Sequence, residues 1–176
     1  MHVWWVCIAY FSKRFLFFEA CLLTSVYLLR IYIGVLVIDT GTSQWLILFS
    51  FCFFFFLVLV KRHTELLLYK KSLDKNPTGR GYKTEDIKLI QPIAIASAMV
   101  ALVVFGLYIA SPKVQALYTS PNFLWAVALL GLLWIINVIA LVHREKMHND
   151  PIVFAFTNKT SLGIFLISII LIILSL

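Results

Sequence analysis

Five consecutive residues, Lys61-Arg62-His63-Thr64-Glu65, combine the side chains of this sequence that are best suited to binding an anion. They follow a run of phenylalanine and aliphatic residues and open a long hydrophilic segment, residues 61–88. In a helix, Glu65 lies one turn from both Lys61 and Arg62, so both cations can share a face with the carboxylate. At the end of a membrane helix, that face suits a phosphorylated lipid head group. The alternative is that the two cations only anchor a helix end at the membrane surface.

The composition predicts an integral membrane protein. Hydrophobic residues make up 62% of the 176 residues and charged residues 13%, with a mean hydropathy of +0.97, well outside the range of soluble domains. A membrane-spanning helix takes about 20 residues, so the chain has room for a handful of helices and one modest loop. We therefore expect an all-α bundle of transmembrane helices without a separate soluble domain.

The hydropathy pattern predicts five full spans preceded by an incomplete one. The full spans are residues 15–38, 44–60, 87–110, 123–142 and 161–176. Residues 1–11 are also apolar, but they reach only about half of the hydrocarbon thickness. The basic pair Lys13-Arg14 follows them, whereas a secretory signal has its positive charge in front. We interpret residues 1–11 as the second half of a helix whose first half is missing.

Positive charge is concentrated on one side of this predicted topology. Thirteen of the fifteen Lys and Arg residues fall in residues 12–14, 61–88 and 143–160, which are expected to be cytoplasmic. Topology thus accounts for the net charge of +7, and no nucleic-acid partner is predicted. Cations with a few carboxylates beneath apolar helices suit a substrate that is part phosphate and part hydrocarbon, with Mg²⁺ bridging carboxylate and phosphate oxygens.

Two charges, Glu19 and Arg30, fall inside the first full span. They are eleven residues apart, close to three helical turns, so they project from the same stripe of the helix. Intramembrane charges are costly and usually face a polar cavity. The alternative is that Glu19 lies at the interface and Arg30 pairs with another helix.

In the span after the hydrophilic segment, small residues between Ala94 and Ala101 favour close helix packing.

Five short motifs resemble the C-terminal half of the UbiA-superfamily membrane prenyltransferases, in the expected order and over nearly the whole chain. They are AYFSKR at 9–14, YLLRI with a following glycine at 27–34, KRHTEL at 61–66, GRGY with an acidic pair at 79–86, and HNDPIVFA at 148–155. Their counterparts in the family are AYS..LKR, Y.LRI..G, KRYAEL, GRGY..ED and HDDPVVFA. Within the superfamily, the chain is most similar to decaprenyl-phosphate phosphoribosyltransferases and to UbiA domains fused to haloacid-dehalogenase-like hydrolases.

The resemblance implies a nine-helix fold in the bacterial cytoplasmic membrane, of which residues 1–176 would form the C-terminal part. It implies a cytoplasm-facing cavity in which Mg²⁺ and acidic motifs hold a diphosphate. The activity would be transfer of a prenyl or phosphoribosyl group, with a polyprenyl phosphate or a prenyl diphosphate lipid as substrate. Carried over, Lys61, Arg62 and Glu65 are the catalytic residues, with Glu65 as the metal ligand. Lys13 and Arg30 would support the two basic residues in phosphate binding.

Two departures from the family pattern leave alternatives open. The first acidic motif of the family, NDxxDxxxD, has no counterpart here, and position 63 is His where the branch often has Tyr. One alternative is a transferase completed by a missing N-terminal half or a second chain. The other is a non-catalytic membrane protein, either a helical scaffold or a remnant that has lost activity.

Overall fold

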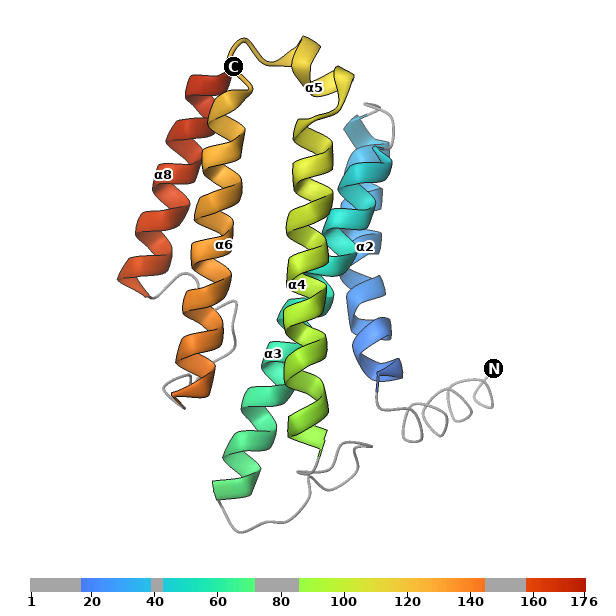
Figure 1. Ribbon diagram of the computed structural model, residues 1–176. Coiled ribbons are helices and arrows are strands. Elements are labelled where there is room, and N and C mark those ends of the chain that lie inside the picture. Colours follow the sequence, from blue (N-terminus) through green and yellow to red (C-terminus); the bar gives the residue numbers. More distant parts are fainter. Residues whose placement is uncertain (1–16, 39–42, 72–85, 145–157) are drawn as a thin grey trace, which may run out of the picture.

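The computed structural model describes residues 17–38, 43–71, 86–144 and 158–176. Within these ranges, all regular secondary structure is helical, which confirms the all-α prediction (Figure 1). The helices are α2 (Phe18–Ile38), α3 (Gln44–Lys71), α4 (Ile87–Ile109), α5 (Pro112–Leu117), α6 (Asn122–His143) and α8 (Lys159–Ser175). The short helix α5 lies between the predicted spans 87–110 and 123–142.

Four helices, α2, α3, α4 and α6, are long and apolar enough to cross a membrane. They correspond to the first four predicted full spans and support a multi-pass membrane protein. Helix α8 is also apolar but has 17 residues, about 26 Å at 1.5 Å per residue, and corresponds to the fifth predicted span. The predicted incomplete span at residues 1–11 lies outside the described residues.

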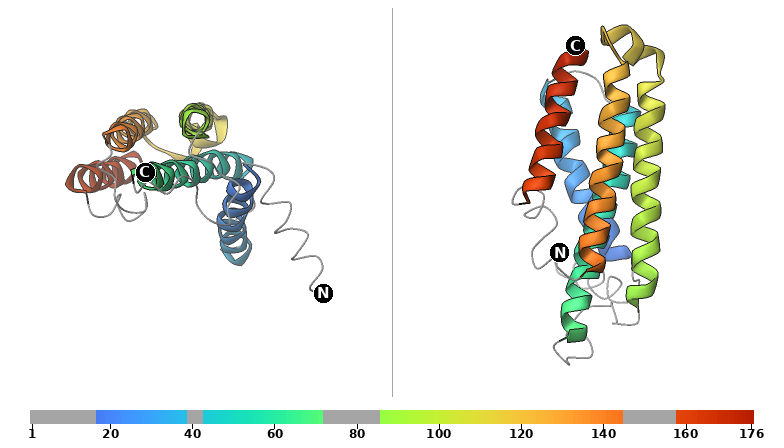
Figure 2. Two further views of the ribbon diagram at one scale, coloured as in Figure 1. Left: turned by 90° about the horizontal axis from the view of Figure 1, so that it is seen from below. Right: turned by 60° about the vertical axis from the view of Figure 1, so that its left-hand side comes forward.

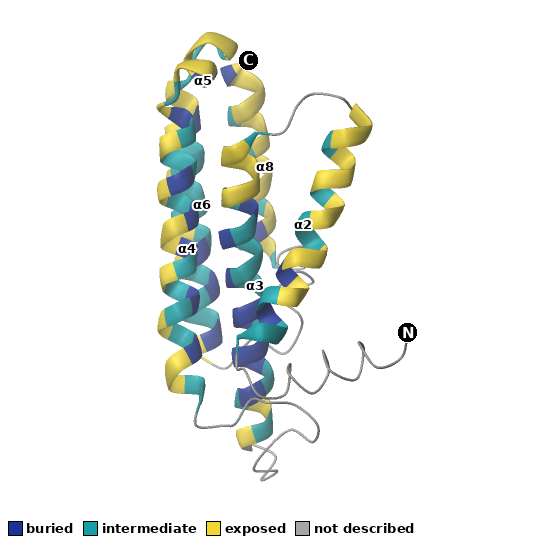
Figure 3. Cartoon of the chain, turned by 90° about the vertical axis from the view of Figure 1, so that its right-hand side faces the viewer, coloured by how far each residue is buried: buried dark blue, intermediate teal, exposed yellow. Residues whose placement is uncertain are grey.

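Helix α3 is the central element of the bundle. It packs against α2 on one side and against α4 and α6 on the other, while α6 also packs against α4 and α8. Figure 2 shows this division from below, with α2 across α3 from α4 and α6. Within the described ranges, α2 packs substantially only on α3, so most of its surface is exposed (Figure 3).

Small side chains let α3 and α4 approach each other closely. Ala94, Ala98 and Ala101 of α4 are buried, and the Ser97 hydroxyl donates a hydrogen bond to the backbone carbonyl of Cys52 at 2.7 Å. Without bulky side chains between them, two helix backbones can come near enough for such side chain to backbone bonds in the bilayer. The small-residue face expected from the sequence is thus confirmed for Ala94, Ser97, Ala98 and Ala101, whereas Ala96 is exposed.

Helix α3 continues beyond the predicted apolar span 44–60. The span was expected to end at residue 60, before the hydrophilic segment, but the helix continues to Lys71. Leu66, Leu67 and Leu68 are strong helix formers, and Leu66 is buried in the core. The buried part of α3 therefore extends past the first cations, as the dark residues in its lower half show (Figure 3). The charged pentapeptide belongs to a packed helix and is not merely an exposed helix end.

Candidate charged site between helices α2 and α3

Arg62 is the centre of an ion-pair cluster that joins α3 to α2. Only 6% of the surface of Arg62 is exposed. Its Nη1 donates to Glu65 Oε2 at 2.6 Å, and its Nη2 donates to Glu19 Oε1. The side chains of Glu19 and Glu65 are 25% and 29% exposed. One buried guanidinium thus holds two partly open carboxylates from two helices, and the three groups together carry a formal charge of −1.

The local sequence explains how each side chain reaches this cluster. Arg62 and Glu65 are one helical turn apart, so their side chains meet on the surface of α3. Glu19 lies in the first turn of α2, where the helix dipole favours an acidic side chain. Ala20 and Thr24 beside it are buried, and Thr24 donates its hydroxyl to the Ala20 carbonyl at 2.8 Å. Ala20 is small, and the Thr24 hydroxyl already has its hydrogen-bond partner within α2, so this end of α2 can pack closely on α3.

The second half of the α2 interface is aromatic. Tyr27 stacks on Phe54 of α3 with ring centroids 5.2 Å apart. Beyond this contact, an open groove of about 350 Å³ runs between α2 and α3. It is lined by Ser25, Leu28, Leu29, Ile31, Tyr32 and Ile47. Its volume is in the range of small-molecule pockets, and its lining is mostly apolar.

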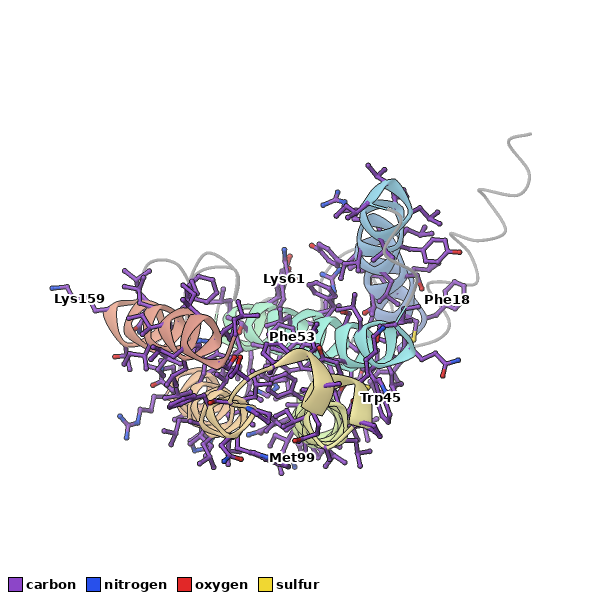
Figure 4. All side chains as sticks on the ribbon, turned by 90° about the horizontal axis from the view of Figure 1, so that it is seen from above. Phe18, Trp45, Phe53, Lys61, Met99 and Lys159 are labelled. Carbon is purple, nitrogen blue, oxygen red and sulfur yellow. The ribbon has the colours of Figure 1, made fainter. Side chains whose placement is uncertain are left out.

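The structure brings together some of the predicted site residues but not all of them. The predicted Arg62–Glu65 pairing is confirmed. Lys61 projects from α3 on the side facing away from Met99 of α4, as Figure 4 shows, and its side chain is half-buried. Arg30 lies eleven residues along α2 from Glu19, about 16 Å at 1.5 Å per residue, and is exposed. Lys13 lies outside the residues that the structure describes.

Glu19 is a site residue that was not predicted for this cluster. The sequence grouped Glu19 with Arg30, since both lie on one stripe of α2, but its carboxylate pairs with Arg62 of α3. In the sequence, Glu19 is a lone acidic residue near one end of an apolar span. Such a residue indicates that a polar or cationic partner lies close to it, but not which residue that partner is. Only the packing of α2 on α3 decides which cation that partner is.

His63 faces a different part of the bundle. It is 5% exposed, and its Nδ1 has no hydrogen-bond partner among the described residues. It lines a cavity of about 20 Å³ between α3, α4 and α6, together with Gln91, Val142 and apolar neighbours. This volume holds about one water molecule and excludes a diphosphate. We therefore do not include His63 among the groups that contact a substrate phosphate.

The described residues contain two carboxylates suited to a metal ion but no complete set of ligands. No three His, Cys, Asp or Glu side chains in these ranges are grouped so that they could hold a metal. Mg²⁺ is commonly bound by one or two carboxylates, with substrate phosphates and water supplying the other oxygens. Glu19 and Glu65 match this minimal set in number and chemistry, and both are bound to Arg62 in the structure.

The fold and this charged cluster define an all-helical, multi-pass membrane protein with a buried arginine between two spans. No protein-family model matches the chain, and no solved structure matches it significantly. It is similar to an uncharacterized protein, y4nM, of Sinorhizobium fredii, with 35% identity over 150 residues, 85% of this chain and 29% of that protein. It is also similar to the nodulation protein NoeC of Azorhizobium caulinodans, with 26% identity over 141 residues, 80% of this chain and 46% of NoeC. The chain thus spans less than half the length of either relative.

Proposed function

We propose that this chain is part of a UbiA-type transferase that binds the phosphate of a polyprenyl phosphate or a prenyl diphosphate lipid beside Lys61 and Arg62. The observation that carries the proposal is the buried Arg62, held between Glu19 and Glu65 in a bundle of apolar helices. A fixed guanidinium presents a planar set of donors that suits phosphate. Lys61, on the neighbouring position of α3, adds a second cation for the same anion.

The chemistry proposed for the site is transfer of a prenyl or phosphoribosyl group. An acceptor atom forms a bond to the allylic or anomeric carbon, the bond between that carbon and the diphosphate oxygen breaks, and diphosphate leaves with the bonding electrons. Glu65 and Glu19 would hold Mg²⁺, which, when bound, neutralises charge on the leaving diphosphate. Lys61 and Arg62 would stabilise the remaining phosphate charge as it develops, and such electrostatic stabilisation is usually the largest contribution to catalysis. The apolar groove between α2 and α3 supplies a surface for the hydrocarbon part of the lipid.

A complete active site requires more acidic ligands than the described residues contain. We propose that an upstream half or a second chain supplies them, because the sequence lacks the first acidic motif of the resembling family. The relatives are long enough to include such a segment, since the matched region covers only 29% and 46% of them. The name of NoeC relates that protein to nodulation. A role of this chain in nodulation would be a proposal that rests on this similarity alone.

A second candidate function is that of a non-catalytic membrane scaffold. Both carboxylates of the cluster already bind Arg62, as they would in a purely structural link between two helices. This candidate predicts no metal-dependent binding of phosphorylated lipids. Ligand binding therefore separates the two candidates even before any transfer activity is reconstituted.

The test uses the full chain in lipid nanodiscs, with decaprenyl phosphate as the probe and decaprenol as the uncharged control. We expect the phosphate form to bind more tightly than decaprenol and Mg²⁺ to strengthen its binding. Lys61→Ala should weaken that binding by about 10- to 100-fold, since a hydrogen bond to a charged group contributes about 1.5–3 kcal/mol. Glu65→Gln should remove the strengthening by Mg²⁺, because Glu65 acts on the phosphate only through the metal ion. Lys113→Ala, at an exposed position on α5, is the matched control and should leave binding unchanged.

Transfer itself is tested by supplying an upstream acidic half as a second chain. Mg²⁺-dependent transfer of the phosphoribosyl group from phosphoribosyl diphosphate to decaprenyl phosphate, with release of diphosphate, is the expected result, and Lys61→Ala and Glu65→Gln should abolish it. If the reconstituted protein works equally well with both substitutions, the site assignment is wrong. If decaprenyl phosphate and decaprenol bind alike with and without Mg²⁺, the scaffold function is favoured.

A further inference from the structure

Arg30 occupies an unusual position in the membrane. It lies two residues past the midpoint of the 21-residue helix α2, so its backbone is within about 3 Å of the centre of the span. Its side chain is exposed, and its guanidinium carbon lies 5.7 Å from the centroid of the Tyr27 ring. No carboxylate within the described ranges pairs with it.

An arginine exposed to lipid at this depth is strongly unfavourable. A charged side chain at the centre of a membrane helix is costly, and charged residues in spans usually face protein or a polar cavity. The contact with one tyrosine ring offsets only part of that cost. The face of α2 that carries Arg30 therefore requires a cover with a group that accepts hydrogen bonds.

None of the three acidic residues that the structure describes pairs with Arg30. Glu19 and Glu65 bind Arg62, and Asp86 is the N-cap of α4. The remaining five, Asp39, Asp74, Glu85, Glu145 and Asp150, fall between the spans in the sequence, and residues 1–16 contain no Asp or Glu. A second copy inserted in the same orientation would thus bring no carboxylate to the depth of Arg30.

The surface around Arg30 has the shape of a helix-packing face. Leu23, Val26 and Val37 are exposed on the same stripe, and Gly34 lies one turn from Arg30. A Cβ atom built on Gly34 meets nothing within 4 Å, so the glycine is not required by its described neighbours. In membranes, small residues at such positions let another helix approach closely.

We propose that this stripe of α2 (Leu23, Val26, Arg30, Gly34 and Val37) is the docking surface for a further membrane-spanning helix that carries a carboxylate at the depth of Arg30. The helix would pack over Gly34 and pair its carboxylate with the guanidinium. The inference rests on charge, depth and packing, and does not require the proposed transferase activity. The two relatives, more than twice as long as the matched region, have length for additional helices.

The experiment measures energy transfer between the full chain, labelled at its C-terminus, and synthetic peptides in phosphatidylcholine vesicles. The peptides are 21-residue Leu/Ala helices that differ only at the central residue, which is Glu, Leu or Lys. The Glu peptide should associate about three- to tenfold more tightly than the Leu peptide, the range for one polar contact between membrane helices. The Lys peptide should associate least.

Three variants locate the contact. Arg30→Leu should reduce association of the Glu peptide to that of the Leu peptide, and Arg30→Gln, which keeps a polar side chain, should give an intermediate value. Gly34→Leu should weaken association by blocking close approach. Gly163→Leu in α8 is the matched control, because a Cβ there also meets nothing within 4 Å, and it should have no effect.

Several results would overturn the proposal. The first is equal association of the Glu and Leu peptides, or an Arg30→Leu variant that still prefers the Glu peptide. If copies of the chain associate with one another and displace the Glu peptide, as measured by energy transfer, the face binds a second copy. Association that follows the content of anionic lipid and not the central Glu would assign Arg30 to a lipid phosphate.

Discussion

Replacing Arg62 with methionine should loosen α2 from α3. The substitution keeps an unbranched side chain but removes the guanidinium that binds Glu19 and Glu65. Both carboxylates then lose the counter-charge that Arg62 supplies. Because the described contacts of α2 are mainly with α3, loss of this link should first affect the packing of α2.

The expected cost follows from the burial of the three groups. Breaking one partner of a fully buried ion pair costs about 3–5 kcal/mol. Arg62 is 6% exposed, but the carboxylates keep 25% and 29% exposure, so solvent partly stabilises them once the guanidinium is removed. We therefore expect Arg62→Met to lower the free energy of unfolding by about 2–3 kcal/mol, and Glu19→Gln by about 1 kcal/mol.

The assay is reversible unfolding in bicelles, read by circular dichroism and by energy transfer between labels on α2 and α3. A double-mutant cycle of Arg62→Met and Glu19→Gln should give a coupling energy of about 1–2 kcal/mol. Arg144→Met, at an exposed position after α6, is the control and should change stability by less than about 0.5 kcal/mol. A coupling energy near zero, with α2 still held at its native distance from α3, would refute the ion-pair reasoning.

Two further predictions concern the packing of the other helices. Ala98→Leu should destabilise the protein by about 1–3 kcal/mol, because Ala98 is fully buried at the core, whereas Ala96→Leu on the exposed side of α4 should change the unfolding midpoint little. Trp134→Phe should cost about 1 kcal/mol by removing the hydrogen bond from Trp134 Nε1 to Ser161 Oγ at 3.2 Å, which links α6 to α8. Equal stability of Trp134→Phe and the native protein in the same assay would show that this bond contributes nothing.

Hydropathy alone located the helices well because a span must be apolar over a fixed length, which is a local property of the sequence. The predicted spans 15–38, 87–110 and 123–142 agree with α2, α4 and α6 within a few residues. The predicted span 44–60 covers only the apolar part of α3, because hydropathy follows apolar length and does not say where a helix ends. In the structure, Arg62 is buried by pairing with carboxylates, and the helix continues beyond it.

The sequence by itself determined the class of protein, the helices and the pairing of Arg62 with Glu65, since that pair depends only on helical spacing. Tertiary structure decided the rest of the charged site. It placed Glu19 against Arg62 across 43 positions of sequence, and it left Arg30 on an exposed face of α2. The physical reason is that spacing along one helix fixes which side chains share a stripe. Which residues that stripe contacts depends on how two helices pack. For α2 and α3, the small and aromatic side chains at their contact determine that packing.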